Sequence, residues 1–517
     1  MQATAGTGAG ESTSLPRVPT LRRPDRSTLL RTLGLVAIGT LYLVHTLSRW
    51  NRWQAAGYDL GIFDQAVRAY AHGRRPYVSI KGVDYLIWGD HFHPIIAVAA
   101  PFYWIWDDPR TLLILQVVLV LLSAWPIWRL ARRYLPQPWS DVFVGGYLLG
   151  FPIQAMVDHD VHEISFGLPI AAALVEAVDR RAWRPVVLWG LLLLLVREDM
   201  GIVLAVLGLV LLTMRGGRRV GAGFVVVGAL HYVAVTGWFL PRYAPDGQFA
   251  YWEYESLGPD APSAIVAILT DPLHAAELFF LPPIKTVTML LLVVPLLGLP
   301  LLSRYSLVAL PILAERFFSD RERLWGPHFH YQAIIWPFLV LAALHGARNL
   351  QRWRATRRLR RGPGASRAHL GSTGRVLAGV LALSAPLGML AAPSVWRLAD
   401  EFSGVSYRQQ QRERDLAAAR AMIPPDRCVI AEDRLAIRLT KDDVVMRELH
   451  PRLPPDYVAV DLAREGEYEP QRNPVRHVRE ARELGLVRLA TFGDVQVWGP
   501  REGTGEPRRA CVPWYRR

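Results

Sequence analysis

"LLRTLGLVAIGTLYLVHTLS", residues 29 to 48, is a run of 20 residues in which Arg31 is the only formally charged side chain. A helix needs about 20 mostly apolar residues to cross a bilayer, so this run predicts a first membrane-spanning helix. The basic sequence "LRRPDR" precedes it. Arginines collect at the inner ends of spanning helices, and no small-residue cleavage site follows cleanly. We therefore expect an uncleaved helix whose N-terminal end is cytoplasmic.

The whole chain has the composition of a polytopic membrane protein. It has 517 residues, of which 51% are hydrophobic, and it contains 18 Trp and a formal net charge of +14. Such a chain is too apolar for an ordinary soluble protein of this length. The arginines flank apolar segments and do not form a folded basic surface, so the charge indicates topology and disfavours nucleic acid as a partner.

Alternating apolar and basic segments predict about 11 spans, with a cytoplasmic N-terminus and an extracytoplasmic C-terminus. The predicted transmembrane domain is 29–396, with outer loops at 49–109 and 240–282, after a disordered cytoplasmic tail at 1–28. The segment 94–106 is too short to span and predicts a juxtamembrane helix. The expected spans are 29–48, 110–130, 141–157, 164–178, 185–197, 199–214, 219–239, 283–302, 305–319, 331–346 and 375–394.

The remaining segment, 397–517, predicts a small soluble extracytoplasmic α/β domain. Leu416, Ala419 and Ile423 recur at helical spacing, and four short apolar runs separated by charged turns predict strands. These runs are "CVIAE", "YVAVDL", "VRLATF" and "VQVWG". The domain lacks a glycine-rich phosphate loop, so we expect no nucleotide site. Cys428 and Cys511 could form a disulfide in an oxidising compartment, which two cysteines alone do not establish.

Acids and histidines gather in the predicted outer loops. Ionisable groups beside apolar helices are costly and usually mark a functional site. The segments are "YDLGIFDQ" (58–65), "WGDHFHP" (88–94), "DHDVHE" (158–163), "RED" (197–199) and "GPHFHY" (326–331). We expect an internal ion pair at the turn in "RED". Each of the other clusters also has a structural interpretation, namely a solvated turn or a hydrogen-bonded interface.

The first cluster places Asp59 and Asp64 around a short helix. Apolar residues at helical spacing in "GIFDQAVRAYAHG" predict an amphipathic helix on the membrane surface. Asp59 would lie at its N-terminus, either as a functional acid or as an N-cap that accepts backbone N–H groups. Asp64 falls on the polar face, where we expect a solvated or paired carboxylate.

The other clusters offer ligands for a cation and for an anion. Asp90, His91 and His93 have a spacing compatible with a metal, although paired histidines at an interface more often bond to the backbone. Arginines held outside suit an anionic head group such as a lipid phosphate. Further candidate binding residues are Asp158, His162, Glu163, Arg321, Arg323, His328 and His330.

Taken together, these motifs resemble the DUF2079 family of predicted bacterial membrane proteins. "YDLGIFDQ", "WGDHFHPI", "HEISFGLP", "LLLLLVREDMG" and "HFHYQAIIWPF" carry the resemblance, which covers most of residues 45 to 500. The family is grouped with the GT-C glycosyltransferases, multi-spanning enzymes that take sugar from a polyprenyl-phosphate donor at the outer membrane face. The resemblance implies that function for this chain, in the bacterial cytoplasmic membrane, with a glycan, lipid or protein as acceptor.

The resemblance also implies roles for individual residues. GT-C enzymes carry an essential acid in the first outer loop, which matches Asp59, with Asp64 second. Many of them have two adjacent acids there, whereas this loop separates its acids, so the base and any divalent cation stay open. Lys81 could hold phosphate and Trp88 could stack on a sugar ring. The alternative function is a membrane transporter or lipid-binding scaffold that is not an enzyme.

If these clusters form a single site, their side chains must lie close together in the fold. We expect the side chains of Asp59, His91, Asp158 and His330 to line one outer cavity.

Overall fold

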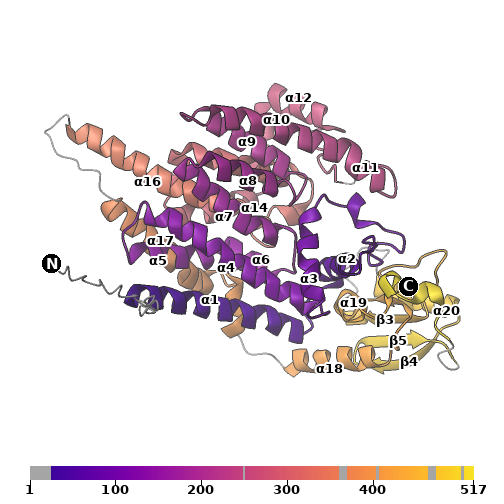
Figure 1. The fold of residues 1–517 in the computed structure, drawn as a ribbon. Coiled ribbons are helices and arrows are strands. Elements are labelled where there is room, and N and C mark those ends of the chain that lie inside the picture. The colour runs from indigo at the N-terminus through magenta and orange to yellow at the C-terminus, as the bar shows by residue number, and fades with distance from the viewer. Residues whose placement is uncertain are drawn as a thin grey trace, which may run out of the picture.

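The computed structural model describes residues 25–248, 251–359, 370–402, 407–463, 473–501 and 506–516. They form a helical bundle with a small α/β unit at one end, shown at the right of Figure 1. The start of α1 and the far end of α16 lie at the opposite end of the bundle. Most of the predicted disordered tail, and part of the arginine-rich loop after residue 347, fall outside the described residues.

The elements of the bundle follow the apolar segments of the sequence. The longer ones are α1 (Arg26–Asn51), α4 (Arg110–Arg132), α5 (Trp139–Leu148), α6 (Phe151–Asp158), α7 (Ile164–Arg180), α8 (Trp183–Leu193), α9 (Met200–Leu212), α10 (Arg218–Ala234), α12 (Ala261–Thr270), α13 (Pro272–Phe280), α14 (Pro283–Val293), α15 (Leu310–Phe318), α16 (Trp336–Leu359) and α17 (Gly371–Ala391). Short helical turns connect them, among them η1 (Gly57–Gly61), α2 (Ile62–Ala71), η2 (Ile87–Gly89), η3 (Pro94–Ala99), α3 (Ala100–Tyr103), η4 (Val235–Phe239), α11 (Leu240–Tyr243), η5 (Val294–Leu296), η6 (Leu299–Leu302), η7 (Arg304–Ala309), η8 (Glu322–Leu324) and η9 (Arg397–Phe402).

The predicted helices are present, but the expected count of about 11 spans is not confirmed. Within the described residues, five helices are long and apolar enough to cross a membrane, or six if the bent pair α12 and α13 counts as one span. Four further apolar helices have 10–17 residues, for example α8 and α9. Breaks shorten several predicted spans. For example, the segment 141–157 is divided between α5 and α6 near Gly150, although the two pieces together are long and apolar enough to cross a membrane.

The C-terminal unit contains a mixed five-stranded sheet with the order β2-β1-β3-β5-β4. β1 pairs in parallel with β2 and β3, whereas β5 is antiparallel to β3 and β4. All four predicted strands are confirmed, as is the predicted helix, and β2 was missed. The elements are α18 (Tyr407–Ala421), β1 (Cys428–Ala431), α19 (Asp433–Leu439), β2 (Val444–Met446), β3 (Tyr457–Asp461), α20 (Pro474–Glu483), β4 (Val487–Phe492), β5 (Val495–Gly499), η12 (Arg509–Cys511) and η13 (Trp514–Arg516).

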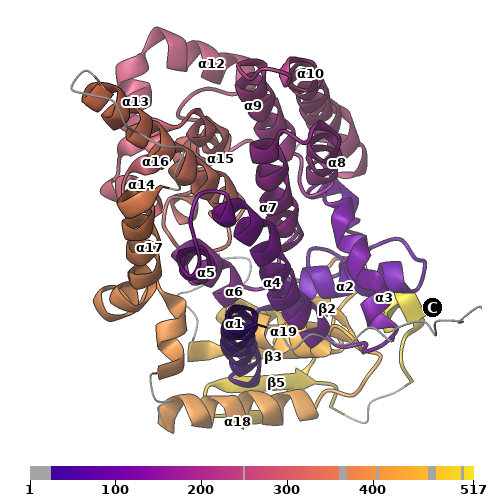
Figure 2. The same ribbon diagram turned by 60° about the vertical axis from the view of Figure 1, so that its left-hand side comes forward.

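One face of this sheet is packed against the bundle. Val429 and Val497 on that face belong to the same buried cluster as the bundle core, together with Leu416 of α18 and Leu435 of α19. The opposite face forms a separate small core with Ala481 of α20. In Figures 1 and 2, α18 and α19 lie beside the sheet near the end of α1. The apolar contact is continuous, so the unit is fixed on the bundle.

The structure corrects the predicted surface helix. α2 is buried on both faces, because the C-terminal unit covers the side expected to meet water. Asp64 is fully buried and accepts from Arg68 at 2.5 and 2.8 Å, from the Tyr103 hydroxyl at 2.7 Å and from the Thr440 hydroxyl at 2.8 Å. Asp64 is therefore a paired acid, as one expectation had it, but not a solvated one, and its contacts join α2 to the C-terminal unit.

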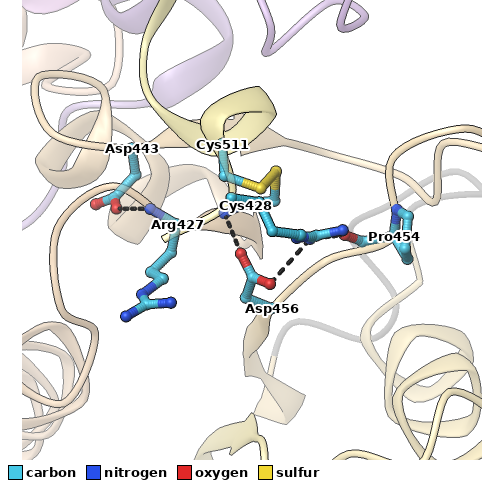
Figure 3. Close-up of a disulfide and its surroundings, with 7 residues drawn as sticks. Arg427, Cys428, Asp443, Pro454, Asp456 and Cys511 are labelled. Carbon is cyan, nitrogen blue, oxygen red and sulfur yellow. Dashed lines mark hydrogen bonds and ion pairs between the residues drawn. A yellow bond between two sulfur atoms is a disulfide. The ribbon is translucent and has the colours of Figure 1, made fainter. Parts of the chain in front are cut away.

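A disulfide between Cys428 and Cys511 closes the far side of the sheet (Figure 3). It joins the start of β1 to η12, 83 residues later, and so anchors the C-terminal segment to the sheet. Asp456 supports the same point by accepting from the Cys428 backbone N–H at 2.9 Å. Disulfides form and persist in oxidising compartments, which agrees with the extracytoplasmic location expected for this unit.

Asp443, just before β2, is a buried acid with one unsatisfied oxygen. Its Oδ1 accepts from the Arg427 N–H at 3.0 Å (Figure 3), whereas Oδ2 is buried without a hydrogen bond in the described part of the chain. Burial raises the pKa of Asp443 from about 3.8 to about 7. The folded state thus keeps a proton between pH 4 and 7 that the unfolded state loses, so this residue lowers stability as pH rises through that window.

We expect Asp443→Asn to remove that loss, because the amide keeps the acceptor oxygen and cannot ionise. The free energy of unfolding of the variant relative to the parent should be up to about 4 kcal/mol higher at pH 8 than at pH 4, since one unit of pKa shift corresponds to about 1.4 kcal/mol. Melting temperatures of the detergent-solubilised chain between pH 4.5 and 8.5 measure it. Asp442→Asn, at a neighbour whose side chain is 37% exposed, should keep the parental pH slope. An unchanged slope in Asp443→Asn would contradict the expectation.

Candidate functional site

The turn that carries Asp59 is held between the bundle and the C-terminal unit. η1 begins and ends with glycine, and a Cβ at Gly57 would lie 2.6 Å from the Ala436 Cβ of α19. The absent side chain lets α19 pack directly on the turn. On the other side, Asp160 accepts from the Ala56 backbone N–H at 2.6 Å and so fixes the loop 158–163 against the entry to η1.

Asp59 itself points to two histidines of that loop. Its Oδ2 lies 3.0 Å from His159 Nε2, and its Oδ1 lies 3.4 Å from His162 Nε2. The side chain does not cap α2, whose first residue is preceded by Gly61 without a side-chain cap bond, so the N-cap interpretation is wrong. Burial by itself raises the pKa of Asp59, but the bonds from His159 and His162 outweigh it and hold that pKa well below its ordinary value. The carboxylate stays ionised at neutral pH.

A third histidine joins these two from a distant loop. His330 stacks on His162 with ring centroids 3.7 Å apart, and on His159 at 5.4 Å. One ligating atom from each of the three rings lies within 4.8 Å of the others. His330 Nδ1 is buried and has no hydrogen bond to any described residue. Three imidazoles with an unsatisfied nitrogen fit a borderline-soft divalent cation such as zinc, so these residues are the candidate ligands for a metal.

A cavity of about 400 Å³ lies beside this cluster, and we call it the lipid-side cavity. Apolar side chains of α12 and α15, such as Ile265 and Phe318, line one part of it, and polar groups line the other. His91 stands in the polar part, stacked on Tyr251 at 4.1 Å and bonded through Nδ1 to Glu198 at 2.7 Å. Burial lowers the pKa of His91, but the Glu198 carboxylate outweighs it and raises that pKa to about 9.

Two arginines also line the polar part of the lipid-side cavity. Arg321 is paired with Glu253. Arg197 donates to Asp199 at 2.8 Å, which confirms the ion pair expected at the "RED" turn, and its Nη1 lies 3.7 Å from Glu163 Oε1. The cavity therefore combines an apolar wall with a polar end, where His91, Arg197 and Arg321 are each paired with a carboxylate that also lines the cavity.

The lipid-side cavity and the histidine cluster share a wall. Tyr331 lines the cavity, and its ring lies 4.4 Å from that of His330. Glu163 links the same two places from the other direction, because its second oxygen lies 3.6 Å from His162 Nδ1. Burial lowers the pKa of His162, but Asp59 and Glu163 outweigh it and raise that pKa to about 9. A chain of ionic contacts therefore links Asp59 through His162 and Glu163 to Arg197, which lines the cavity.

Asp158 faces away from the lipid-side cavity. Its carboxylate contacts Arg397 Nε at 2.7 Å and His45 Nε2 at 3.1 Å, and it lines a separate polar cavity. His91 and Asp158 thus belong to two different cavities, and the expectation of a single shared cavity is wrong. The physical reason is that the loop 158–163 runs through the space between them, so its successive residues point to opposite sides.

The other predicted site residues lie around the cluster and not in it. Asp90 is paired with Lys81 and accepts from the Tyr85 hydroxyl at 3.0 Å, whereas its neighbour His91 is bonded to Glu198. His93 packs against Phe63. Trp88 donates to the Tyr70 hydroxyl and does not line the lipid-side cavity, whereas Trp252 does. Arg323 and His328 are exposed.

The structure brings into the site several residues that the sequence analysis does not single out. His159 stood inside a recognised cluster and makes the shortest contact to Asp59. Tyr251 and Glu253 had no local signal. His45 had one, because it is a histidine within the apolar run of the first helix, and ionisable residues there point to function. It lies between Asp158 and Glu401, with Nδ1 3.1 Å from the latter.

Comparison with known proteins agrees with this architecture. The model of a family described as "Predicted membrane protein (DUF2079)" matches residues 49–478. Two structures of ArnT from Cupriavidus metallidurans, one bound to undecaprenyl phosphate and one in the apo state, superpose with a TM-score of 0.52. They are 12% and 13% identical and cover 94% of this chain and 100% of theirs. The likeness establishes the fold. A search of curated proteins finds no significant match.

Proposed function

The chain belongs to the DUF2079 family of predicted membrane proteins, and we propose that it transfers a sugar from a polyprenyl-phosphate donor to an acceptor. One observation carries the proposal: the lipid-side cavity, apolar along one wall and lined by ion-paired charges at the other end, adjoins the histidine cluster that contacts Asp59, an acid of the first outer loop. A lipid-linked sugar phosphate has the same two-part character. The ArnT fold supports the proposal, and that protein is solved with undecaprenyl phosphate bound.

The cavity suits the donor in three respects. Its apolar wall on α12 and α15 would receive the first isoprene units, whose burial is favourable in proportion to apolar area. His91 and Arg321 would bind the phosphate, because charge-assisted hydrogen bonds to phosphate are stronger than neutral ones. Trp252 and Tyr251 offer aromatic faces at the same end. The sugar would then point toward Tyr331 and the histidine cluster.

Asp59 is placed to act on the acceptor. In the proposed reaction, the bond between the anomeric carbon and the phosphate oxygen breaks, and the acceptor oxygen bonds to that carbon. The acceptor proton passes to the Asp59 carboxylate, and polyprenyl phosphate leaves with the electron pair. His162 and Arg197 would stabilise the negative charge on the departing phosphate. A divalent cation held by the three histidines in their neutral form would instead take the place of the His162 charge in that stabilisation.

The proposal includes an orientation in the bacterial cytoplasmic membrane. We place the N-terminus in the cytoplasm and the C-terminal unit, 397–517, outside. The Cys428–Cys511 disulfide of that unit supports this placement, because disulfides form and persist in oxidising compartments. α16, which carries Arg352 and Arg357 in its second half, extends toward the opposite end of the bundle (Figure 1), where positive charge is expected to face the cytoplasm.

We expect His91→Gln to weaken binding of undecaprenyl phosphate by about tenfold, because glutamine keeps the bond to Glu198 but has no charge for the phosphate. Binding to the purified chain in lipid nanodiscs, with uncharged undecaprenol as the comparison ligand, measures the effect. The matched control is His274→Gln, at a side chain on α13 that is 51% exposed. Undecaprenol should bind both variants equally.

Sugar transfer is tested with the same preparation and a panel of polyprenyl-phosphate-linked sugars. Release of polyprenyl phosphate with appearance of a glycosylated acceptor supports the proposal. Tight binding of polyprenyl phosphates without turnover of any donor, in the presence of glycan, lipid and peptide acceptors, would contradict it and favour a lipid-binding scaffold.

A further inference from the structure

A polar passage lies between the bundle and the C-terminal unit and shares no lining residue with the lipid-side cavity. It has two chambers, of about 320 and 630 Å³. Four side chains line both chambers, so the chambers are contiguous: Arg52, Gln54, Gln409 and Arg434. We call the pair the interdomain passage.

The smaller chamber borders the loop 158–163, whose histidines contact Asp59. Asp158 lines it, and the next residue, His159, makes the 3.0 Å contact with Asp59. His45 and Arg49 of α1 line the same chamber from the bundle. The larger chamber continues away from the bundle between α18 and the ends of β3 and β5, where Asp461 and Val495 line it. A long molecule in the passage would therefore have one end at Asp158.

The lining of the passage excludes a lipid chain. All residues of the smaller chamber are charged, histidine or glutamine, and only Leu416, Ala463 and Val495 of the larger chamber have apolar side chains. Burying polar groups against hydrocarbon without hydrogen bonds is unfavourable. The lipid-side cavity has the opposite character along α12 and α15. The interdomain passage and the lipid-side cavity thus suit ligands of different solubility.

The charges of the passage are nearly balanced, which indicates the ligand class. The larger chamber has four arginines and four carboxylates, and the smaller one mixes Arg49, Arg52, Arg397 and Arg434 with three carboxylates. A polyanion or polycation would meet as many like charges as opposite ones. A ligand with many hydroxyl groups can donate to the carboxylates and accept from guanidinium and amide groups at once. Neutral glycans have this property.

We propose that the interdomain passage is the acceptor subsite and binds a neutral, water-soluble glycan chain whose terminal hydroxyl reaches Asp59. The inference rests on the proposed function for its catalytic meaning, but glycan binding does not require turnover. In the transfer step, that hydroxyl oxygen bonds to the anomeric carbon of the donor sugar, its proton passes to Asp59, and polyprenyl phosphate leaves with the electrons of the broken bond. Donor and acceptor would approach the acid from opposite sides.

Gln54→Trp tests the subsite, because an indole at the junction of the chambers would block the passage. Binding of maltotetraose, mannotetraose and arabinotetraose to the full chain in nanodiscs is measured first, beside tetragalacturonic acid as an anionic comparison. We expect at least one neutral tetrasaccharide to bind the parent and to lose tenfold or more in affinity in Gln54→Trp. The affinity for undecaprenyl phosphate should change less than twofold. Asn51→Trp, at an exposed residue of α1, controls for an added indole.

The outcomes separate this inference from the proposed function. Neutral glycan binding that Gln54→Trp abolishes, without any donor turnover, supports the subsite while the transferase proposal fails. Turnover with a lipid or peptide acceptor whose KM is the same in the parent and in Gln54→Trp overturns the subsite while the transferase proposal stands. Binding of tetragalacturonic acid alone, or of no tetrasaccharide, also overturns it.

Discussion

Asp59→Asn is expected to lower kcat/KM for sugar transfer by about 10² to 10⁴, the range that a positioned acid or base contributes. The amide cannot take the acceptor proton. In the parent, the two carboxylate oxygens lie 3.0 Å from His159 and 3.4 Å from His162. In the variant, both histidines lose this anionic partner, and one of them faces an NH₂ group. Single-turnover transfer from a bound donor measures the chemical step without product release.

The matched control for this substitution is Asp84→Asn, on the same outer loop but with an exposed side chain. It removes one negative charge from the same region and should leave kcat/KM within twofold of the parent. Affinity for undecaprenyl phosphate should be nearly unchanged in both variants, because Asp59 does not line the lipid-side cavity. Parental turnover in Asp59→Asn would exclude this residue as the base.

The sequence predicted which segments carry the chemistry better than it predicted how they meet. Family membership was recognised from five short motifs and is confirmed by the match over residues 49–478. Of the four residues expected to line one cavity, Asp59 and His330 meet at His159, whereas His91 and Asp158 line two different cavities. Local patterns could not show that "DHDVHE" presents its acids and histidines to two different cavities, because the direction of each side chain depends on how its loop packs.

The fold was predictable where hydropathy or alternation extends over several residues. Helix positions and four strands follow from such runs, whereas β2 has three residues, too few to show a period. The number of spans was harder to predict from the sequence, since π and 3-10 turns interrupt apolar segments that look continuous. The buried state of Asp64 was inaccessible, because the hydroxyl that completes its environment belongs to Thr440, 376 residues away.

That long-range contact leads to the largest expected effect on stability. Arg68 is fully buried and donates to both oxygens of Asp64, and its Nε donates to Asp107 at 2.7 Å. Asp64→Asn would leave the guanidinium in a dry interface with one partner fewer. Removing one member of a buried ion pair typically costs about 3 to 5 kcal/mol. We expect a melting temperature several degrees lower, with faster proteolysis between the bundle and the C-terminal unit.

The double variant Asp64→Asn with Arg68→Gln separates charge from packing. It removes both charges and keeps two amides that can bond to each other, to Tyr103 and to Thr440, so it should recover a large part of the lost stability. Activity per folded molecule of Asp64→Asn, measured at low temperature, should stay within a few-fold of the parent, because its carboxylate contacts neither the histidine cluster nor the lipid-side cavity. A loss as large as that of Asp59→Asn would instead make both acids part of the reaction. A stability loss in the double variant equal to that of the single one would mean that shape and not charge holds this interface together.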